Sequence, residues 1–123
     1  MAQVFGLDHV SVIVADAEKA RAFYQSVLGL EDITRPDLGF PGFWLALGGG
    51  QTLHLMQLPN PYQNITQPDH GGRDRHLALR VKFLDQAMQK LDQAGINYTC
   101  SQSGRQALFF KDLDNNVVEL IVS

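Results

Sequence analysis

The sequence predicts an α+β fold of two tandem β-α-β-β-β modules, whose curved mixed sheets surround a concave metal site. A strand-like segment with His9 near its start is followed by a helical pattern, and a similar segment with His76 near its start is followed by another. Each half also ends in a short apolar segment with one further polar residue, His54 in the first and Glu119 in the second. The two halves therefore match in both plan and polar positions.

The chain has 123 residues, of which 45% are hydrophobic, so it is long enough for one core and too short for two independent domains. We place module one at about residues 5–58, the linker at about 59–73 and module two at about 74–123. The net charge of -3 and the lack of basic runs argue against nucleic acid as a partner and favour small molecules or proteins. No segment approaches the roughly 18 apolar residues of a membrane span, and no signal-like N-terminus is present, so we expect a cytoplasmic protein without membrane contact.

The first module begins with a strand at residues 7–14, where alternation puts three valines on one face and His9 on the other. The valine face is expected to pack against the helix that follows. Asp16 is suited to its N-cap, and Gly29 is suited to a left-handed C-terminal cap. Three short strands should complete the module, near residues 31–34, 43–47 and 52–58.

The second module repeats this plan, with a strand at about 75–81 and a helix at about 84–94 before Gly95. Its remaining strands are predicted near residues 97–101, 106–111 and 117–121. The linker is rich in Pro, Asn, Gln and Gly, and its length permits a mobile lid. We expect His70, in the linker, to be exposed to solvent, and Cys100, the single cysteine, to be a small buried residue.

Strand alternation indicates a metal site, because His9, His54, His76 and Glu119 all avoid the faces that pack against the helices. For a single histidine, an ordinary surface or hydrogen-bonded role is the commoner one. Three imidazoles and a carboxylate together, if poorly paired and buried, would each cost roughly 2 to 7 kcal/mol. The set therefore favours a divalent ion, and ligands of these types suit Fe, Mn, Co, Ni or Zn.

Arg80 and Trp44 are the candidate substrate-binding residues. Arg80 shares the strand face of His76, where its guanidinium could hold an anionic substrate group by two hydrogen bonds. Trp44 either lines an apolar part of the pocket or fills the core. Three further arginines lie in segments that could rim the cavity, although surface solvation or an ion pair is the commoner role for each: Arg73, Arg75 and Arg105.

Three segments carry a family resemblance: residues 7–10, 22–30 and 109–119. With the paired modules, they make the chain resemble the vicinal oxygen chelate superfamily of glyoxalases, fosfomycin-resistance enzymes, extradiol dioxygenases, epimerases and bleomycin-binding proteins. The resemblance covers nearly the whole chain. It implies a homodimer in which the first module of one chain faces the second module of its partner, so that both chains contribute to each site. The metal ligands it implies are His9, His54, His76 and Glu119.

The resemblance implies a metal-dependent, glyoxalase-like lyase or isomerase, in which the metal stabilises a developing oxyanion on a small oxygen-chelating substrate. Glu119 is the implied catalytic base, and His54 is the second candidate if it is not a ligand. Lactoylglutathione lyases typically have Glu where this chain has His54 and Arg where it has Ile13, so the glutathione adduct of methylglyoxal is not the expected substrate. Two alternatives stay open: an Fe(II) extradiol-type dioxygenase and a non-enzymatic drug- or metabolite-binding protein of the bleomycin-resistance type.

Overall fold

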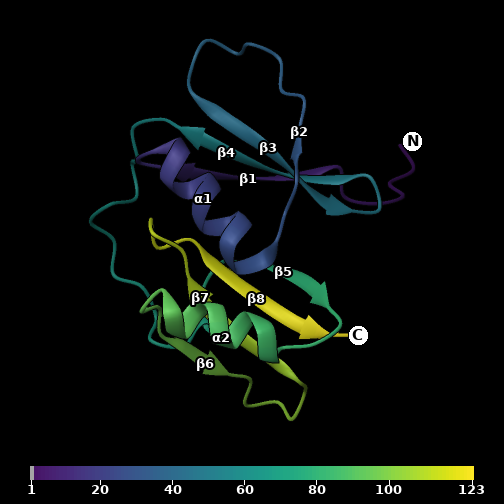
Figure 1. Ribbon diagram of the computed structural model, residues 1–123, viewed down its shortest axis with the longest axis vertical. Helices are drawn as coiled ribbons and strands as arrows, with labels where there is room; N and C mark the ends of the chain where they lie inside the picture. Colours follow the sequence, from purple (N-terminus) through teal and green to yellow (C-terminus); the bar gives the residue numbers. More distant parts are fainter. Residues whose placement is uncertain (1) are drawn as a thin grey trace.

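The structure is a computed structural model that describes residues 2–123, and it consists of two sheets of four strands with one helix each (Figure 1). In the first module, β1 runs parallel to β4, while β3 is antiparallel to both β4 and β2. The first module comprises β1 (His9–Val14), α1 (Ala17–Leu28), β2 (Asp32–Ile33), β3 (Gly42–Gly48) and β4 (Gln51–Gln57).

The second sheet repeats the first in strand order and strand direction. Its order is β5-β8-β7-β6, matching β1-β4-β3-β2, and β5 is parallel to β8 as β1 is to β4. The second module comprises the short 3-10 helix η1 (Gly71–Arg73), then β5 (His76–Val81), α2 (Asp85–Gln93), β6 (Tyr98–Cys100), β7 (Ala107–Lys111) and β8 (Val117–Val122). The predicted fold of two β-α-β-β-β modules is confirmed, and neither sheet closes on itself.

Helix α1 begins and ends where its local sequence predicts. The Asp16 side chain accepts a hydrogen bond from the Lys19 N–H at 3.1 Å, and Gly29 adopts the left-handed conformation with φ of 66°. The helix buries Phe23 and Val27 against a core that includes Val12 and thus the predicted valine face of β1. Both capping predictions are therefore confirmed.

Two predictions of detail are wrong. Strand β1 begins at His9 rather than Leu7, because its parallel partner β4 begins at Gln51 and pairing starts with His9 opposite Thr52. Cys100 is exposed rather than buried, since it ends the three-residue edge strand β6.

The turn between β7 and β8 joins the two modules. Asp112, at its start, is buried and accepts a hydrogen bond of 2.6 Å from the hydroxyl of Tyr24 on α1. The side chain of Asn116 donates to the Ile13 carbonyl at 3.1 Å. Apolar side chains of both helices and both sheets form one continuous core behind these contacts. The modules are thus held in a fixed relation, which also fixes where their polar faces lie.

No helix within the described residues 2–123 has the length and apolar character needed to cross a membrane.

Candidate metal centre

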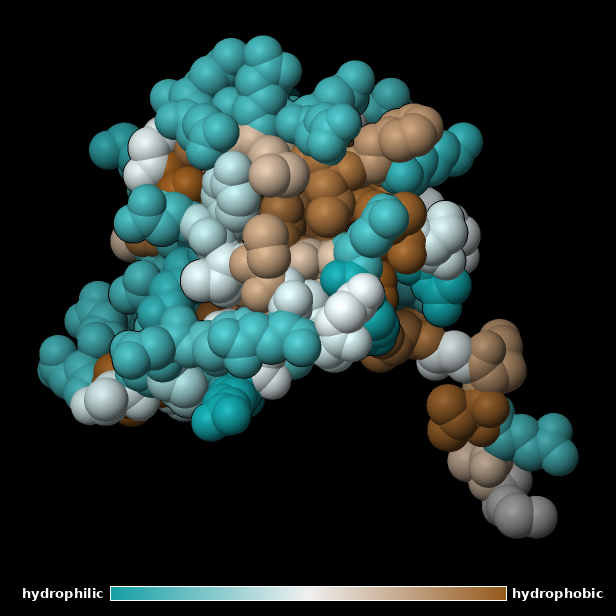
Figure 2. All heavy atoms as spheres, turned by 90° about the horizontal axis from the view of Figure 1, so that it is seen from below, coloured by the Kyte–Doolittle hydropathy of each residue, from teal (hydrophilic) through white to brown (hydrophobic). Residues whose placement is uncertain are grey.

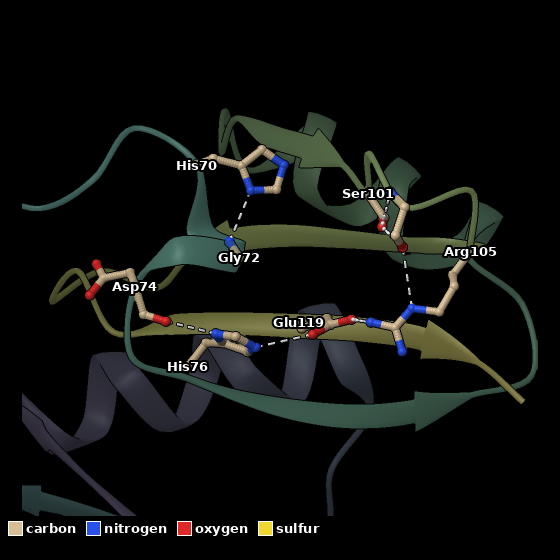
Figure 3. A network of polar contacts seen from close by, with 8 residues as sticks. His70, Gly72, Asp74, His76, Ser101, Arg105 and Glu119 are labelled. Carbon is tan, nitrogen blue, oxygen red and sulfur yellow. Dashed lines mark hydrogen bonds and ion pairs between the residues drawn. The ribbon is translucent and has the colours of Figure 1, made fainter.

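The second module brings His76 and Glu119 together on the open face of its sheet. Glu119 lies opposite Ala78 in the parallel pairing of β5 and β8, so His76 at the start of β5 is its diagonal neighbour. The His76 Nε2 atom is 3.1 Å from the Glu119 Oε1 atom (Figure 3). Glu119 is only 4% exposed, whereas the His76 side chain is 26% exposed. The pair is therefore anchored in the sheet and open to the concave side.

The hydrogen bonds of His76 leave its Nε2 atom available as a ligand. Its Nδ1 atom lies 2.8 Å from the carbonyl oxygen of Asp74, which can only accept, so Nδ1 carries the proton. The Nε2 lone pair then faces a carboxylate oxygen, an arrangement that requires a proton or a metal ion between them. Metal-binding histidines commonly donate from the other ring nitrogen to a carbonyl in this way. This donor set fits a divalent metal.

Arg105 adds a positive charge on the other side of Glu119. Its Nη2 atom is 3.3 Å from the Glu119 Oε2 atom, and its side chain remains 60% exposed. Figure 3 shows His76, Glu119 and Arg105 following one another along the face of β8. The sequence placed Arg105 in a segment that could rim the cavity, with surface solvation or an ion pair as the commoner role, but it named no partner. The residue lies in the loop before β7, where no strand alternation indicates a direction. Its exposed guanidinium can hold an anionic group beside Glu119.

The first module brings His9 and His54 together differently. Their rings are stacked with centroids 4.0 Å apart and planes 11° from parallel. The Trp44 ring stacks on His54, with centroids 4.2 Å apart and planes 4° from parallel. The His9 Nδ1 atom is 2.7 Å from a carboxylate oxygen of Asp8. Trp44 is therefore partly buried and stacked on the candidate ligand His54.

The stacking prevents His9 and His54 from binding one ion in this arrangement, because an imidazole lone pair lies in the plane of its ring and these two planes do not meet. The His54 Nε2 atom is also engaged, at 2.8 Å from the Thr52 hydroxyl. Burial, followed by the nearby His9, lowers the pKa of His54 below its ordinary value. His9 is the better placed ligand of the two, since Asp8 holds its Nδ1 and no hydrogen bond to its Nε2 is found within residues 2–123.

Within one chain, the His9–His54 pair and the His76–Glu119 pair do not come together. Within residues 2–123, no three His, Cys, Asp or Glu side chains come close enough to hold a metal ion. The four candidate ligands thus form two separate pairs, one in each module. Arg80 lies toward the end of β5, is exposed and donates to the Ser123 hydroxyl at 3.3 Å.

His70 is not the solvent-exposed linker residue that the sequence suggested. Its ring is partly buried and packs against Phe109, with centroids 5.1 Å apart, and Phe109 also contacts His76 at 5.4 Å. Its Nδ1 atom accepts a hydrogen bond of 3.0 Å from the Gly72 N–H (Figure 3). A Cβ on Gly71 would lie 2.8 Å from the Phe109 Cβ, so glycine allows the linker to approach this closely. The expectation failed because Phe109 is distant in sequence.

Comparison with known proteins identifies the family. The model of the Glyoxalase/Bleomycin resistance protein/Dioxygenase superfamily matches residues 6–120. The chain belongs to this superfamily. Its relatives include Glyoxylase I 4 of Arabidopsis thaliana, which is 33% identical over 93% of this chain and 68% of the relative. The mitochondrial methylmalonyl-CoA epimerase of Bos taurus is 28% identical over 88% of this chain and 67% of the relative.

Solved structures agree with this superfamily assignment. The fosfomycin resistance protein FosX of Listeria monocytogenes, as an E126Q mutant complexed with Mn(II) and 1S,2S-dihydroxypropylphosphonic acid, has a TM-score of 0.76. The likeness covers 98% of this chain and 94% of that one at 20% identity, and it shows the shared fold alone. A protein of this fold thus holds a divalent metal and a small oxygen-rich ligand.

A cavity of about 640 Å³ lies beside His76, between the two modules. Its walls include Ser11 and Met56 of the first module, His76 of the second, and the linker residues Tyr62 and Gln67. The Gln67 amide donates to Asp74 at 2.9 Å, which holds the linker in place next to His76. The segment suggested as a mobile lid is therefore in contact with the site.

Proposed function

We propose that this chain is a metal-dependent lyase or isomerase that acts on a small substrate with neighbouring oxygen atoms. The observation that carries the proposal is the His76 Nε2 atom facing the buried Glu119 carboxylate at 3.1 Å. The Nδ1 atom of His76 is committed to the Asp74 carbonyl, so the ligand geometry exists before any metal arrives. The glyoxylase and epimerase among the relatives support this class of reaction.

The site is completed by a second copy of the chain. His76 and Glu119 form one half-site, and His9, held by Asp8, supplies the missing imidazole from module one of the partner. The two His and one carboxylate donors suit Fe, Mn, Co, Ni or Zn. His54 becomes a fourth ligand only if its ring leaves the stack with His9 and Trp44. The functional unit in this proposal is a homodimer with shared sites.

The bound metal supplies Lewis-acid stabilisation of negative charge on a substrate oxygen. A carboxylate oxygen of Glu119 accepts the proton from the carbon next to the substrate carbonyl, and His54, whose pKa is lowered, is the second candidate base. The exposed guanidinium of Arg105 binds an anionic group of the substrate, and Arg80 is the alternative cation on the same sheet. Trp44 provides a flat apolar wall.

Two residues argue against the glutathione adduct of methylglyoxal as the substrate. Ile13 and His54 stand where lactoylglutathione lyases typically have Arg and Glu. An arginine on β1 would supply a charge for an anionic adduct, and isoleucine supplies none. A smaller chelating substrate without the peptide portion fits this chain better.

The test is elemental analysis of untagged protein, reported as metal per chain, for the wild type and for His76→Ala. We expect near-stoichiometric metal in the wild type, and loss of both metal and turnover in the variant. Full metal content and normal activity in His76→Ala would overturn the proposal. The exposed acid Glu31, replaced as Glu31→Gln, is the control and should retain its metal.

Two further assays separate the alternative functions. Oxygen uptake with a catechol, after anaerobic loading with Fe(II), would identify an extradiol-type dioxygenase. Ligand binding that survives a chelator and yields no product would identify a binding protein.

A further inference from the structure

The cavity between the modules has walls from separate parts of the chain. Residues 10–13 of β1, residues 74–77 around the start of β5, several linker residues between 60 and 67, and the turn at 113–117 all line it. By contrast, the exposed apolar residues Val4 and Phe5 lie on the N-terminal segment, which projects from the body of the protein (Figure 2). The cavity, at about 640 Å³, is within the usual size range of small-molecule sites. The fold can therefore surround a small ligand here.

Arg75 belongs to this wall and has an unused guanidinium. Within residues 2–123 the guanidinium forms no ion pair or hydrogen bond, and it lies over the Tyr62 ring at 5.0 Å from the centroid. Arg21 and Arg105, in contrast, pair with carboxylates of the chain. Stacking on an aromatic ring orients a guanidinium while leaving its five N–H donors free. Arg75 is thus a positioned cation without an acceptor in its own chain.

The two carboxylates of the cavity wall are already engaged elsewhere. One Asp74 oxygen accepts from the Gln67 amide at 2.9 Å, and the other accepts from the Arg75 main-chain N–H at 2.7 Å. On the module-one side, Asp114 accepts from the Ala15 N–H at 2.9 Å. These bonds hold the linker and the turn in place, and they leave the Arg75 side chain available to an external acceptor.

The charges and amides around the cavity select the kind of acceptor. Two carboxylates against one guanidinium leave an excess of negative charge, which disfavours a dianion such as phosphate. A single carboxylate can still be bound by the fork of Arg75 through two hydrogen bonds. Side-chain amides both donate and accept, so they suit an amide or hydroxyl group on the same ligand. The amide residues of the wall are Asn60, Gln63, Gln67, Asn115 and Asn116.

We propose that the cavity between the modules binds a small carboxylic acid that also carries an amide or hydroxyl group, with its carboxylate held by Arg75. Of the candidate metal ligands, only His76 is in the wall, so the site is distinct from the His76 and Glu119 pair. The inference does not depend on a bound metal or on the proposed reaction. Because Tyr62 supports the guanidinium, the bound acid also fixes the linker against module two.

The site is tested by NMR titration of the whole chain, isotopically labelled and treated with a chelator. The probe is N-benzoylglycine, and its matched control is N-benzoylglycinamide, which has a neutral amide in place of the carboxylate. We expect saturable shifts in residues 60–67 and 74–77, and tighter binding of the acid by at least about tenfold. Saturable shifts centred on Arg105 and Glu119, or no saturable shift at all, would overturn the proposal.

The role of Arg75 is tested with the variant Arg75→Gln, which should bind the acid and its amide analogue with equal affinity. Arg73→Gln removes an exposed arginine outside the cavity wall, and as the matched control it should keep the preference for the acid. A preference that survives in Arg75→Gln contradicts the proposal, as does an equal loss in both variants. Inorganic phosphate should cause no saturable shift in the wild type. Saturation by phosphate at Arg75 would contradict the choice of a carboxylate.

Discussion

The two modules share a backbone and differ in what their polar pairs do. In both, the first histidine begins a strand and the second polar residue lies further along the parallel partner strand, with Ser11 opposite His54 and Ala78 opposite Glu119. In module two the side chains meet end to end, with the His76 Nε2 atom 3.1 Å from a carboxylate oxygen of Glu119. In module one the two rings lie face to face, 4.0 Å apart.

This difference shows that equivalent strand positions do not create equivalent sites. A carboxylate and an imidazole attract through the edge of the ring, which is also the edge that binds metal. Two imidazoles stack instead, and burial, followed by the neighbouring His9, lowers the pKa of His54 below its ordinary value. Module two thus holds an imidazole edge-on to a buried carboxylate, and module one holds two imidazoles stacked with Trp44.

The largest expected effect comes from removing the charge of module two by Glu119→Gln. Glutamine preserves the shape, so folding should be retained, while metal affinity falls by at least about 100-fold, beyond the 10- to 100-fold typical of losing an outer partner. Titration with Co(II) measures the affinity. An unchanged affinity would mean that the two modules do not differ in the way described.

The next effect separates the two stacked histidines. His9→Ala should reduce metal affinity by at least about tenfold more than His54→Ala, because the His9 Nε2 atom is free to reach an ion while the His54 Nε2 atom contacts Thr52. Parallel Co(II) titrations of the two variants measure the ratio. Equal losses would show that the stack opens and that His54 is a full ligand.

A smaller effect concerns the contact between the modules. Tyr24→Phe removes the donor to Asp112 and leaves a buried carboxyl with one partner fewer, which should lower the free energy of unfolding by about 1–3 kcal/mol. Urea denaturation measures the change. Tyr62→Phe, on a half-exposed ring in the linker, is the control and should unfold like the wild type.

The smallest effect is a pH dependence that arises from Asp112. Burial raises the pKa of its carboxyl above the ordinary value, against the hydrogen bonds that lower it. Between the unfolded-state and folded-state pKa values the native protein holds the extra proton, so this group's contribution to stability falls as pH rises through that interval. Urea midpoints from pH 4 upward should show a slope that Asp112→Asn lacks. Identical slopes would remove Asp112 as the cause.

The fold could be predicted from the sequence because helix caps and strand alternation depend on neighbouring residues alone. Asp16 and Gly29 specify the ends of α1 through their own hydrogen bond and backbone conformation, and alternation in β1 needs only neighbouring residues. The start of β1 could not be read this way. The segment from Leu7 has the composition of a strand, but pairing begins only where β4 supplies a partner.

The sequence predicted which strand residues of the candidate site share a face, but it did not predict the positions of its loop residues. Alternation placed His76 and Glu119 on one face, yet it gave no information on ring orientation, so the stack of His9 and His54 was not foreseen. The positions of Arg105 and His70 depend on loop paths and on contacts across the sheet. Such contacts leave no periodic signal in the sequence.

The turn between β7 and β8 holds the two modules together independently of the chain that connects them. Its hydrogen bonds to Tyr24, Ile13 and Ala15 join the halves together with the shared core, without using the linker. The exposed linker residues Gln63 and Asn64 contribute little to that joint. A break between them would leave two polypeptides with complementary surfaces, so the fold is suited to fragment complementation, in which separately made halves reassemble one protein.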